Sequence, residues 1–359
     1  MAKMAPQWMQ AARWHGRGDV RVERIPLPVP APNELLVKVV HCGICGTDLE
    51  EFREGPLTVP TTPHPVSGRS APLTLGHEVV GVVARAASDG TGPREGTLIV
   101  PDVVDGCGRC WWCQRHEPGL CPALVVRGQQ TDGGLAEYMT ARAESCVVVP
   151  AGVPSQWAAL AEPTSVAVRA IRHAQVMGAR VAVIGAGTIG QLIAQTLMRA
   201  AGARDVLVVD PDLVRLELTR RLAGVRVATP DEAPEAFASA PSPGFDVIFE
   251  CTGRPGQLGQ AMQRVRAGGT VVAVGLRPGS EEISVPGLVL SEKRVVGTAA
   301  HVWDTDVADA VALIADGRID VEDLVTHRVP LVDLVDRGFG ALEDRSSSAV
   351  KVLIDCSDA

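Results

Sequence analysis

Aromatic side chains are scarce in this sequence. Phe, Trp and Tyr together make up 3% of the 359 residues, with a single Tyr, although apolar residues make up 46%. The cores must therefore be built from Val, Leu, Ile and Ala. Charged residues are 21% of the chain, a balance that is typical of a folded globular protein and not of a disordered one. The length predicts about two domains.

The sequence also lacks an excess of basic residues. Its net charge is −8, so it has no basic face to attract phosphates, and we expect no nucleic-acid partner. The opening stretch MAKMAPQWMQAARWHGRGD has no apolar run followed by a cleavage site, so secretion is not expected. Nine cysteines without an export signal then indicate metal or thiol chemistry in a reducing cytoplasm.

One long uncharged run, VAVIGAGTIGQLIAQTLM at 181–198, has the length of a membrane span. Its three glycines and two glutamines argue against a span, and we expect no membrane partner.

The pattern of apolar runs and turn residues changes near residue 157. Before it, short Val-rich runs are separated by Gly and Pro, which is typical of an irregular β-rich domain. After it, apolar runs such as VAVIG and VLVVD alternate with helical stretches, which predicts βαβ units and a doubly wound parallel sheet. From about residue 297 the pattern is mixed again.

The motif VAVIGAGTIG predicts a dinucleotide site. Gly185, Gly187 and Gly190 stand in GxGxxG register between a strand and a helix, where they permit a tight turn and close approach to a pyrophosphate. Asp210 ends the next strand at the spacing of the acid that binds the adenosine ribose, and its charge favours NAD over NADP. Arg215 could weaken that preference, although it is more simply a solvated side chain. The predicted cofactor-binding residues are Gly185, Gly187, Thr188, Ile189, Gly190, Asp210, Arg215 and Thr252.

Four cysteines predict a structural zinc site. Cys107, Cys110, Cys113 and Cys121 stand in CxxCxxCx7C spacing, so their thiolates can close on one tetrahedral ion. The run also resembles bacterial iron-sulfur ligation, but its last gap of seven residues counts against a cluster. We expect a zinc lobe over about 102–125.

A second set of metal-binding residue types is dispersed: Cys45 in ICGTD, His77 and Glu78 in LGHE, and Glu162 in ALAEP. The CxxC formed by Cys42 and Cys45 does not decide by its spacing between a zinc site, a redox pair and buried thiols. Taken with the glycine loop and the four cysteines, this set makes the chain resemble the zinc-dependent medium-chain dehydrogenase/reductase superfamily. The stretches GPLTVPTTPHPVSGRSAPLTLGHE, LAEPTSVAVRA and LVTHRVPL resemble its sorbitol and 2,3-butanediol dehydrogenase branch.

The resemblance implies a fold and a ligand set. It implies a GroES-like, β-rich catalytic domain (1–156 and 298–359), a Rossmann domain (157–297) and a cleft between them. It implies that Cys45, not Cys42, binds a catalytic zinc with His77. Glu78 and Glu162 are then the carboxylates beside the metal, one of them a direct ligand. Cys42 is expected to be a core thiol, and Cys251 is expected near the nicotinamide ribose.

The resemblance also assigns a proton path. Thr47 stands where the family has the hydroxyl that passes the alcohol proton outward, and Asp48 is expected to orient the ligands. Glu50 is a departure, because relatives commonly carry histidine there as the last relay group. Glu51 is expected to be a solvated surface residue.

The function predicted is hydride transfer from a secondary alcohol or vicinal diol or polyol to NAD, giving a ketone. The alternatives are a zinc-independent enoyl or quinone reductase, a biosynthetic dehydrogenase of a cyclic or bulky alcohol, and a non-enzymatic redox sensor. Family members are usually homodimers or homotetramers. Positions alone suggest a substrate pocket lined by Phe52, Leu57, Val59, His301 and Trp303.

Overall fold

The computed structural model describes residues 7–239, 244–276, 279–344 and 347–357. The first six residues of the opening stretch lie outside the described part. The chain divides into two compact units. Unit 1 comprises Met1–Glu162, His301–Ala315 and Val321–Ala359, and unit 2 comprises Pro163–Ala300 and Asp316–Asp320. The sequence places these boundaries a few residues earlier, because α2 (Ser155–Ala158) and the start of α3 (Ala161–Arg172) are helical but belong to unit 1.

Unit 1 is built on three sheets. The largest has the order β10-β6-β5-β3-β18-β17, with β9 also paired to β3; the others have the orders β2-β1-β4 and β7-β8. Their strands are β1 (Trp8–Gly16), β2 (Asp19–Pro26), β3 (Glu34–Gly43), β4 (Leu73–Thr74), β5 (Glu78–Arg85), β6 (Leu98–Pro101), β7 (Val104–Asp105), β8 (Val125–Val126), β9 (Tyr138–Arg142), β10 (Cys146–Val148), β17 (Val325–Pro330) and β18 (Lys351–Asp355).

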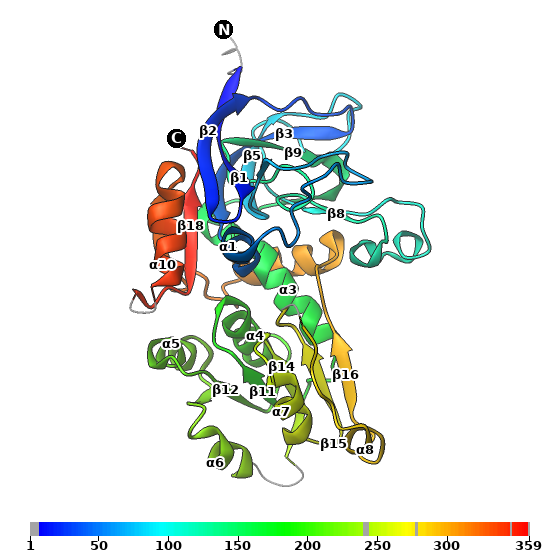
Figure 1. Cartoon of the computed structure of the whole chain (residues 1–359), viewed down its shortest axis with the longest axis vertical. Coiled ribbons are helices and arrows are strands. Elements are labelled where there is room, and N and C mark those ends of the chain that lie inside the picture. Colours follow the sequence, from blue (N-terminus) through cyan, green and yellow to red (C-terminus); the bar gives the residue numbers. More distant parts are fainter. Residues whose placement is uncertain (1–6, 240–243, 277–278, 345–346, 358–359) are drawn as a thin grey trace. The chain divides into compact units, whose positions relative to one another are not determined.

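The helices of unit 1 are short. Besides α2 and the start of α3 they are α1 (Gly46–Glu54), α9 (Ala308–Ala315) and α10 (Gly340–Glu343), with 3-10 turns η1 (Cys113–Arg115), η2 (Pro118–Leu120), η3 (Ala143–Ser145) and η5 (Leu331–Asp333) and π-helical turns η4 (Trp303–Val307) and η6 (Leu334–Phe339). Figure 1 shows the four-cysteine lobe of residues 102–125 projecting from this unit beside β8. Trp14 is one of the few aromatic residues in a core otherwise made largely of Val, Leu, Ile and Ala.

The register of the central strands positions the site. Gly43, the last residue of β3, pairs with Glu78, the first residue of β5, and also with Leu353 of β18. Because paired strand ends lie side by side, the turn that begins at Cys45 comes close to His77 although 32 positions separate them in the chain.

Unit 2 is a six-stranded parallel sheet. Its order, β13-β12-β11-β14-β15-β16, is 3-2-1-4-5-6 in chain order, which is the doubly wound arrangement of the Rossmann fold. The strands are β11 (Arg180–Ile184), β12 (Asp205–Val209), β13 (Arg226–Ala228), β14 (Phe245–Glu250), β15 (Val265–Ala273) and β16 (Arg294–Gly297). The helices are α4 (Thr188–Arg199), α5 (Leu213–Ala223), α6 (Ala233–Ala238), α7 (Gln257–Arg264) and α8 (Val285–Val289).

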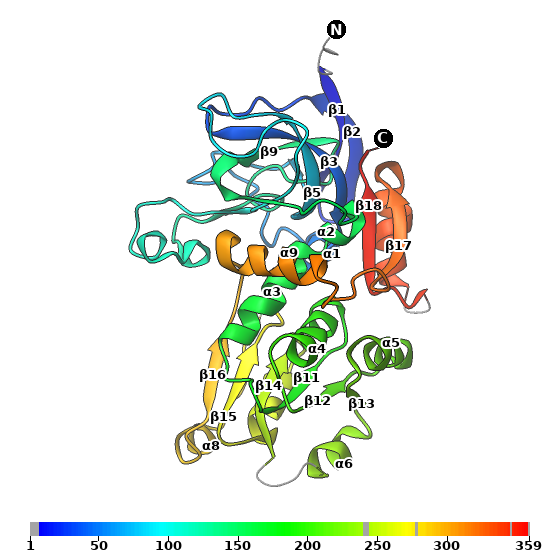
Figure 2. The same ribbon diagram turned by 180° about the vertical axis from the view of Figure 1, so that it is seen from behind.

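The helices of unit 2 cover its sheet. Helix α4 packs on β11 and β12, α5 on β12 and β13, and α7 on β14 and β15 (Figure 2). The predicted parallel sheet is confirmed. The uncharged run at 181–198 divides into β11, the glycine loop and α4, and no helix within the described ranges has the length and hydropathy of a membrane span.

Candidate functional site

The four cysteines of the lobe lie together. One ligand atom from each of Cys107, Cys110, Cys113 and Cys121 lies within 4.8 Å of the other three. The N–H groups of Arg109 and Cys110 lower the pKa of Cys107 to about 6, which favours the thiolate that binds metals. Burial and the neighbouring Cys110 thiol raise the pKa of Cys113 to about 12, so a bound cation would favour the thiolate of Cys113. This donor set fits tetrahedral zinc.

A buried ionic network holds the base of the lobe. Asp105 lies 2.9 Å from the Arg127 guanidinium and 3.0 Å from that of Arg142, and Arg127 also lies 2.7 Å from Glu34. Burial alone would raise the pKa of Glu34, but the Ala31 N–H and the Arg127 charge lower it below its usual value. The lobe is therefore tied to β3 and β9.

The predicted catalytic residues gather at the start of α1. The Cys45 N–H donates to Asp48 Oδ2 at 3.0 Å, and Asp48 Oδ1 accepts from the Gly76 N–H at 3.2 Å. Asp48 thus ties the loop that carries His77 to the helix, as expected for an orienting residue. Thr47 Oγ1 lies 3.4 Å from His77 Nε2. Burial disfavours a charged His77, but Asp48 and Cys45 outweigh it and raise the pKa of His77 well above its usual value.

Glu78 is paired with a lysine that the sequence analysis missed. Lys351 Nζ lies 2.7 and 2.6 Å from the two carboxylate oxygens of Glu78 and donates to the Ile44 carbonyl at 2.9 Å. A Cβ on Gly43 would lie 2.0 Å from Glu78 Oε2, so only glycine leaves room for this carboxylate. The one sequence signal for Lys351 is a charged residue inside the apolar strand AVKVLI.

Glu162 has different neighbours. Its Oε1 lies 3.4 Å from His301 Nδ1, and His301 Nε2 lies 2.9 Å from Asp102 Oδ1. Burial would raise the pKa of Glu162, but His301 and His77 lower it below its usual value. Because both Glu78 oxygens face Lys351, this arrangement favours Glu162 as the direct ligand. Asp102 was missed, and His301, suggested as a pocket residue, instead lies buried between two carboxylates.

Glu51 corrects an expectation. It is not a solvated residue but 1% exposed, because its carboxylate accepts the N–H groups of Leu57, Thr58 and Val59. These contacts fix the turn after α1. Glu50, its neighbour, is exposed on α1 as a relay group at the surface requires.

Two of the suggested pocket residues belong to the packing of unit 1. Phe52 stacks on Phe339 with ring centroids 4.8 Å apart, and Val59 is buried in the core cluster. Leu57 is exposed, and Trp303 is partly buried in η4.

The two metal sets differ in compactness. In the described part of the chain, the lobe cysteines form the one group of His, Cys, Asp and Glu ligand atoms that all lie within 4.8 Å of each other. Cys45, His77 and Glu162 are more loosely gathered, yet all three contribute to one electrostatic environment around His77. His77 Nδ1 lies 3.6 Å from Asp48 Oδ1 without a hydrogen bond, and a thiolate, an imidazole and a carboxylate are donors that suit zinc. The residues therefore fit a second zinc ion.

The glycine loop of unit 2 has the close contacts that its motif predicts. Gly185 has a φ of 105°, and a Cβ on Gly190 would lie 1.9 Å from the Gly185 carbonyl oxygen. Helix α4 begins at Thr188 and Ile189, directly after the loop.

Asp210 is buried against the same loop. Its Oδ2 accepts the Ala186 N–H at 2.7 Å, and its Oδ1 accepts the Asp212 N–H at 2.8 Å. A carboxylate accepts about four hydrogen bonds, so Asp210 keeps capacity for ribose hydroxyls. Arg215 lies 3.5 Å from Asp212, on the first turn of α5.

Glu250, which the sequence analysis missed, supports the other side of the loop. Its carboxylate accepts the N–H of Thr252 at 2.7 Å and that of Gly253 at 3.2 Å. A Cβ on Gly185 would lie 2.9 Å from Thr252 Cγ2, so this turn packs on the glycine loop. Cys251, next to Glu250 in the chain, is partly buried, and desolvation raises its pKa.

The remaining cysteines are packing residues. Cys42, Cys146 and Cys356 are buried in the core of unit 1. Burial raises the pKa of Cys42 well above its usual value, which favours the neutral thiol. The expectation of a core thiol at Cys42 agrees with this position.

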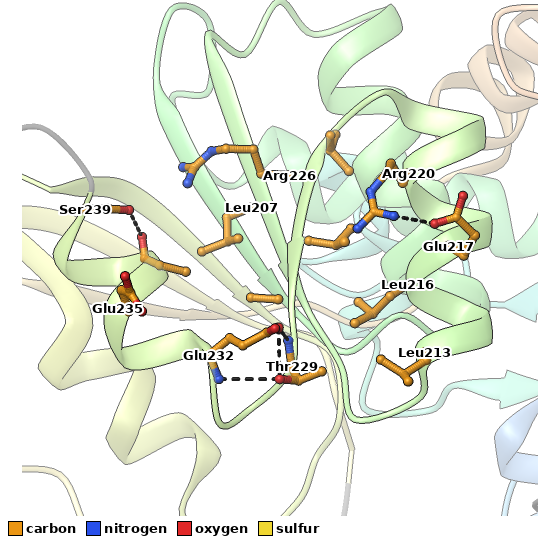
Figure 3. Close-up of a pocket in the computed structure, with 14 residues that line it drawn as sticks. Leu207, Leu213, Leu216, Glu217, Arg220, Arg226, Thr229, Glu232, Glu235 and Ser239 are labelled. Carbon is orange, nitrogen blue, oxygen red and sulfur yellow. Dashed lines mark hydrogen bonds and ion pairs between the residues drawn. The ribbon is translucent and has the colours of Figure 1, made fainter.

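Unit 2 also has a cavity of about 810 Å³ between α5, β13 and α6 (Figure 3). Most of its charged lining already has partners within the protein: Arg220 pairs with Glu217, Arg226 with Asp205, and Glu232 accepts the Thr229 N–H. The cavity therefore offers few polar groups to a ligand.

Comparison with known proteins shows similarity to dehydrogenases along nearly the whole chain. The Alcohol dehydrogenase GroES-like domain matches residues 31–151, and the Zinc-binding dehydrogenase family matches residues 188–316. The (R,R)-butanediol dehydrogenase of Bacillus subtilis (strain 168) is 32% identical over 96% of this chain and 99% of its own. The sorbitol dehydrogenase of the same strain is 28% identical over 99% of each chain.

Solved structures of dehydrogenases are also similar to this chain over nearly its whole length. The crystal structure of 2R,3R-butanediol dehydrogenase from Bacillus subtilis has a TM-score of 0.88, with 31% identity over 97% of this chain and 99% of that one. A putative zinc-binding dehydrogenase from Sinorhizobium meliloti 1021, bound to NADP, has a TM-score of 0.85, with 29% identity over 98% of this chain and 100% of that one.

Proposed function

The chain belongs to the zinc-dependent medium-chain dehydrogenase/reductase superfamily, in its sorbitol and 2,3-butanediol dehydrogenase-like branch, and from this premise we propose that it oxidises a vicinal diol or another secondary alcohol to a ketone with NAD. The observation that carries the proposal is the gathering of Cys45, His77 and Glu162 in one buried environment, with the Thr47 hydroxyl 3.4 Å from His77 Nε2. An enoyl or quinone reductase without zinc would have no use for this set.

Each residue of the site has a separate role in the proposed reaction. Zinc, when bound by Cys45, His77 and Glu162, would acidify the alcohol hydroxyl and polarise the ketone in the reverse reaction. Thr47 Oγ1 accepts the alcohol proton and passes it outward, and the exposed Glu50 on the same helix is the candidate for its release to water. Asp48 keeps the His77 ring in place by fixing both Cys45 and the loop before His77.

NAD is the proposed acceptor because Asp210 would repel a 2′-phosphate. The NADP-bound relative from Sinorhizobium meliloti makes a direct comparison of the two cofactors necessary. We propose a reducing cytoplasm as the site of action, because the cysteines of the chain suit metal binding and core packing.

We also propose a homodimer or homotetramer. Strand β16 ends the sheet order of unit 2, and Val289, Leu290 and Val295 are exposed in and before it. An exposed strand edge with apolar neighbours is a surface that a second copy of the chain can cover. Native mass spectrometry of the purified protein measures the assembly; a monomer would contradict the proposal.

The decisive experiment follows NADH formation with chiral butanediols, sorbitol, L-threonine and cyclic secondary alcohols, with zinc analysis of the same sample. We expect activity on a secondary alcohol and about two zinc ions per chain, one for each donor set. One zinc per chain together with enone or quinone reduction would instead support the zinc-independent reductase. Activity confined to cyclic alcohols would support a biosynthetic dehydrogenase.

A further inference from the structure

His301 links two carboxylates in the interior of unit 1. Its Nε2 lies 2.9 Å from Asp102 Oδ1, and its Nδ1 lies 3.4 Å from Glu162 Oε1. His301, Asp102 and Glu162 are 1%, 2% and 8% exposed, so solvent does not screen these contacts. Because the two ring nitrogens of an imidazole point in different directions, one histidine can contact both acids and fix their separation.

Asp102 is itself rigidly placed at the base of the lobe. Its N–H donates to the Ser145 carbonyl at 2.8 Å, and its Oδ1 accepts the Val104 N–H at 3.0 Å. The residue whose carboxylate faces His301 is therefore held by Val104 of β7, the strand from which the lobe emerges, and by Ser145 of η3. The position of His301 follows from the position of that base.

A second contact joins the lobe to the segment that carries His301. His116, at the end of the 3-10 turn η1, places its Nε2 2.5 Å from Asp304 Oδ1 in η4. Within this segment the Val302 N–H donates to Asp306 Oδ2 at 2.8 Å, which stiffens the turn. Residues 301–307 are thus held at two points by the lobe, once at its base and once at its far end.

The contact with Glu162 distinguishes this arrangement from an ordinary buried ion pair. The 3.4 Å separation is too long for a strong hydrogen bond, and among the residues that the structure describes the buried His301 Nδ1 has no hydrogen-bond partner. A histidine that served only to neutralise Asp102 would need no second acid. Since a carboxylate has several lone-pair directions, a contact at Oε1 restricts the carboxylate while leaving it able to bind a metal.

We propose that His301 is a positioning residue that holds the Glu162 carboxylate for the catalytic zinc, and that the four-cysteine lobe sets His301 through Asp102 and through the His116–Asp304 contact. The proposal rests on the proposed function, in which Glu162 is a zinc ligand. It gives the lobe a role at the second metal site, beyond its own fold.

Two substitutions of His301 separate its two contacts. The amide nitrogen of Gln lies near the place of Nε2, and that of Asn near the place of Nδ1. His301→Gln therefore keeps a donor toward Asp102 and loses the one toward Glu162, whereas His301→Asn does the reverse. The full-length, zinc-loaded enzymes are mixed with a chromogenic chelator, and the phase of zinc release that is missing from Cys45→Ser is assigned to the catalytic ion.

We expect His301→Gln to release that ion about 10–100-fold faster than the wild type, in line with the loss of other groups that orient metal ligands. We expect His301→Asn to recover part of the loss. The visible spectrum of Co²⁺ bound at the same site should change in the same order, because it reports ligand geometry and not overall stability. Equal release rates and equal Co²⁺ spectra in wild type and both variants would overturn the proposal.

The lobe is tested by His116→Ala, since this side chain is exposed and its loss should not prevent folding. The control is Arg115→Ala, which removes an exposed neighbour that lies over the Trp111 ring. We expect faster release of the catalytic ion from the first variant only; identical release from both would remove the lobe from the proposal. If Cys45→Ser holds as much zinc as the wild type, the proposed function itself fails.

Discussion

Lys351 Nζ lies within 2.7 Å of both carboxylate oxygens of Glu78, and both side chains are almost completely buried beside the predicted catalytic residues. Burial alone would lower the pKa of Lys351, but the Glu78 carboxylate raises it, so the lysine stays charged. The pair therefore cancels one of the negative charges that Cys45, Glu78 and Glu162 bring to the site.

Removing this lysine should destabilise the fold. Lys351→Met leaves Glu78 buried without its cation, and we expect a loss of about 3–5 kcal/mol in the free energy of unfolding. Urea unfolding of the metal-free protein measures it, with Lys38→Met on the exposed face of β3 as the control. Adding Glu78→Gln should recover part of the loss; a double variant as unstable as the sum of both single variants would contradict the pairing.

The Glu51 contacts predict a cost that an exposed acid would not have. Glu51→Gln places an amide NH₂ against backbone N–H donors of residues 57–59, and we expect about 1–3 kcal/mol of destabilisation. Glu54→Gln, three residues later and exposed, should leave the free energy of unfolding nearly unchanged. Thermal unfolding of the two variants under the same conditions measures the difference in stability. Equal midpoints would show that the Glu51 contacts do not stabilise the fold.

These residues show where sequence reasoning stops. The glycine loop and the four cysteines were predictable because their ligands demand fixed local spacings. The burial of Glu51 was not predicted, because its hydrogen-bond partners lie in an irregular turn that no periodicity of the sequence indicates. Asp102 and His301 are 199 positions apart, and Glu78 and Lys351 are 273 apart. Glu78 and Lys351 meet because β5 and β18 both pair with β3, and Asp102 and His301 meet between segments that lie outside the strands. The local sequence pattern encodes neither contact.

The ion pair between Glu34 and Arg127 predicts a pH dependence. The pKa of Glu34 is lowered in the folded state from its usual 4.5, so its contribution to stability is present above pH 4.5 and is lost as the pH falls through the lowered value. The stability difference between wild type and Glu34→Gln should therefore shrink on acidification. Unfolding titrations across this range measure it, with the exposed Glu144→Gln as the control; a difference that stays constant would exclude the linkage.

Thr47 and Glu50 should differ in importance. We expect Thr47→Val to lower turnover at least about tenfold, since it removes the hydroxyl beside His77 that takes the alcohol proton. Glu50→Gln should alter the pH profile of oxidation only modestly, because a carboxylate, unlike the histidine common in relatives, ordinarily titrates well below neutrality. Steady-state kinetics across pH compare the two variants. Similar losses of turnover from both would make Glu50 an obligatory exit for the proton.

Asp210 should serve both cofactor choice and the shape of the glycine loop. Asp210→Asn keeps an oxygen that can accept the Ala186 N–H but removes the charge, so the preference for NAD over NADP should fall by about tenfold, or about 1.4 kcal/mol. Asp210→Ala also leaves the Ala186 N–H without its acceptor, so it should weaken the binding of both cofactors. The ratio of kcat/KM for NAD and NADP isolates the charge effect, and fluorescence titration with NADH isolates the loop effect. If Asp210→Asn leaves the ratio unchanged while Arg215→Ala shifts it, cofactor choice lies with the arginine on α5 and not with the acid.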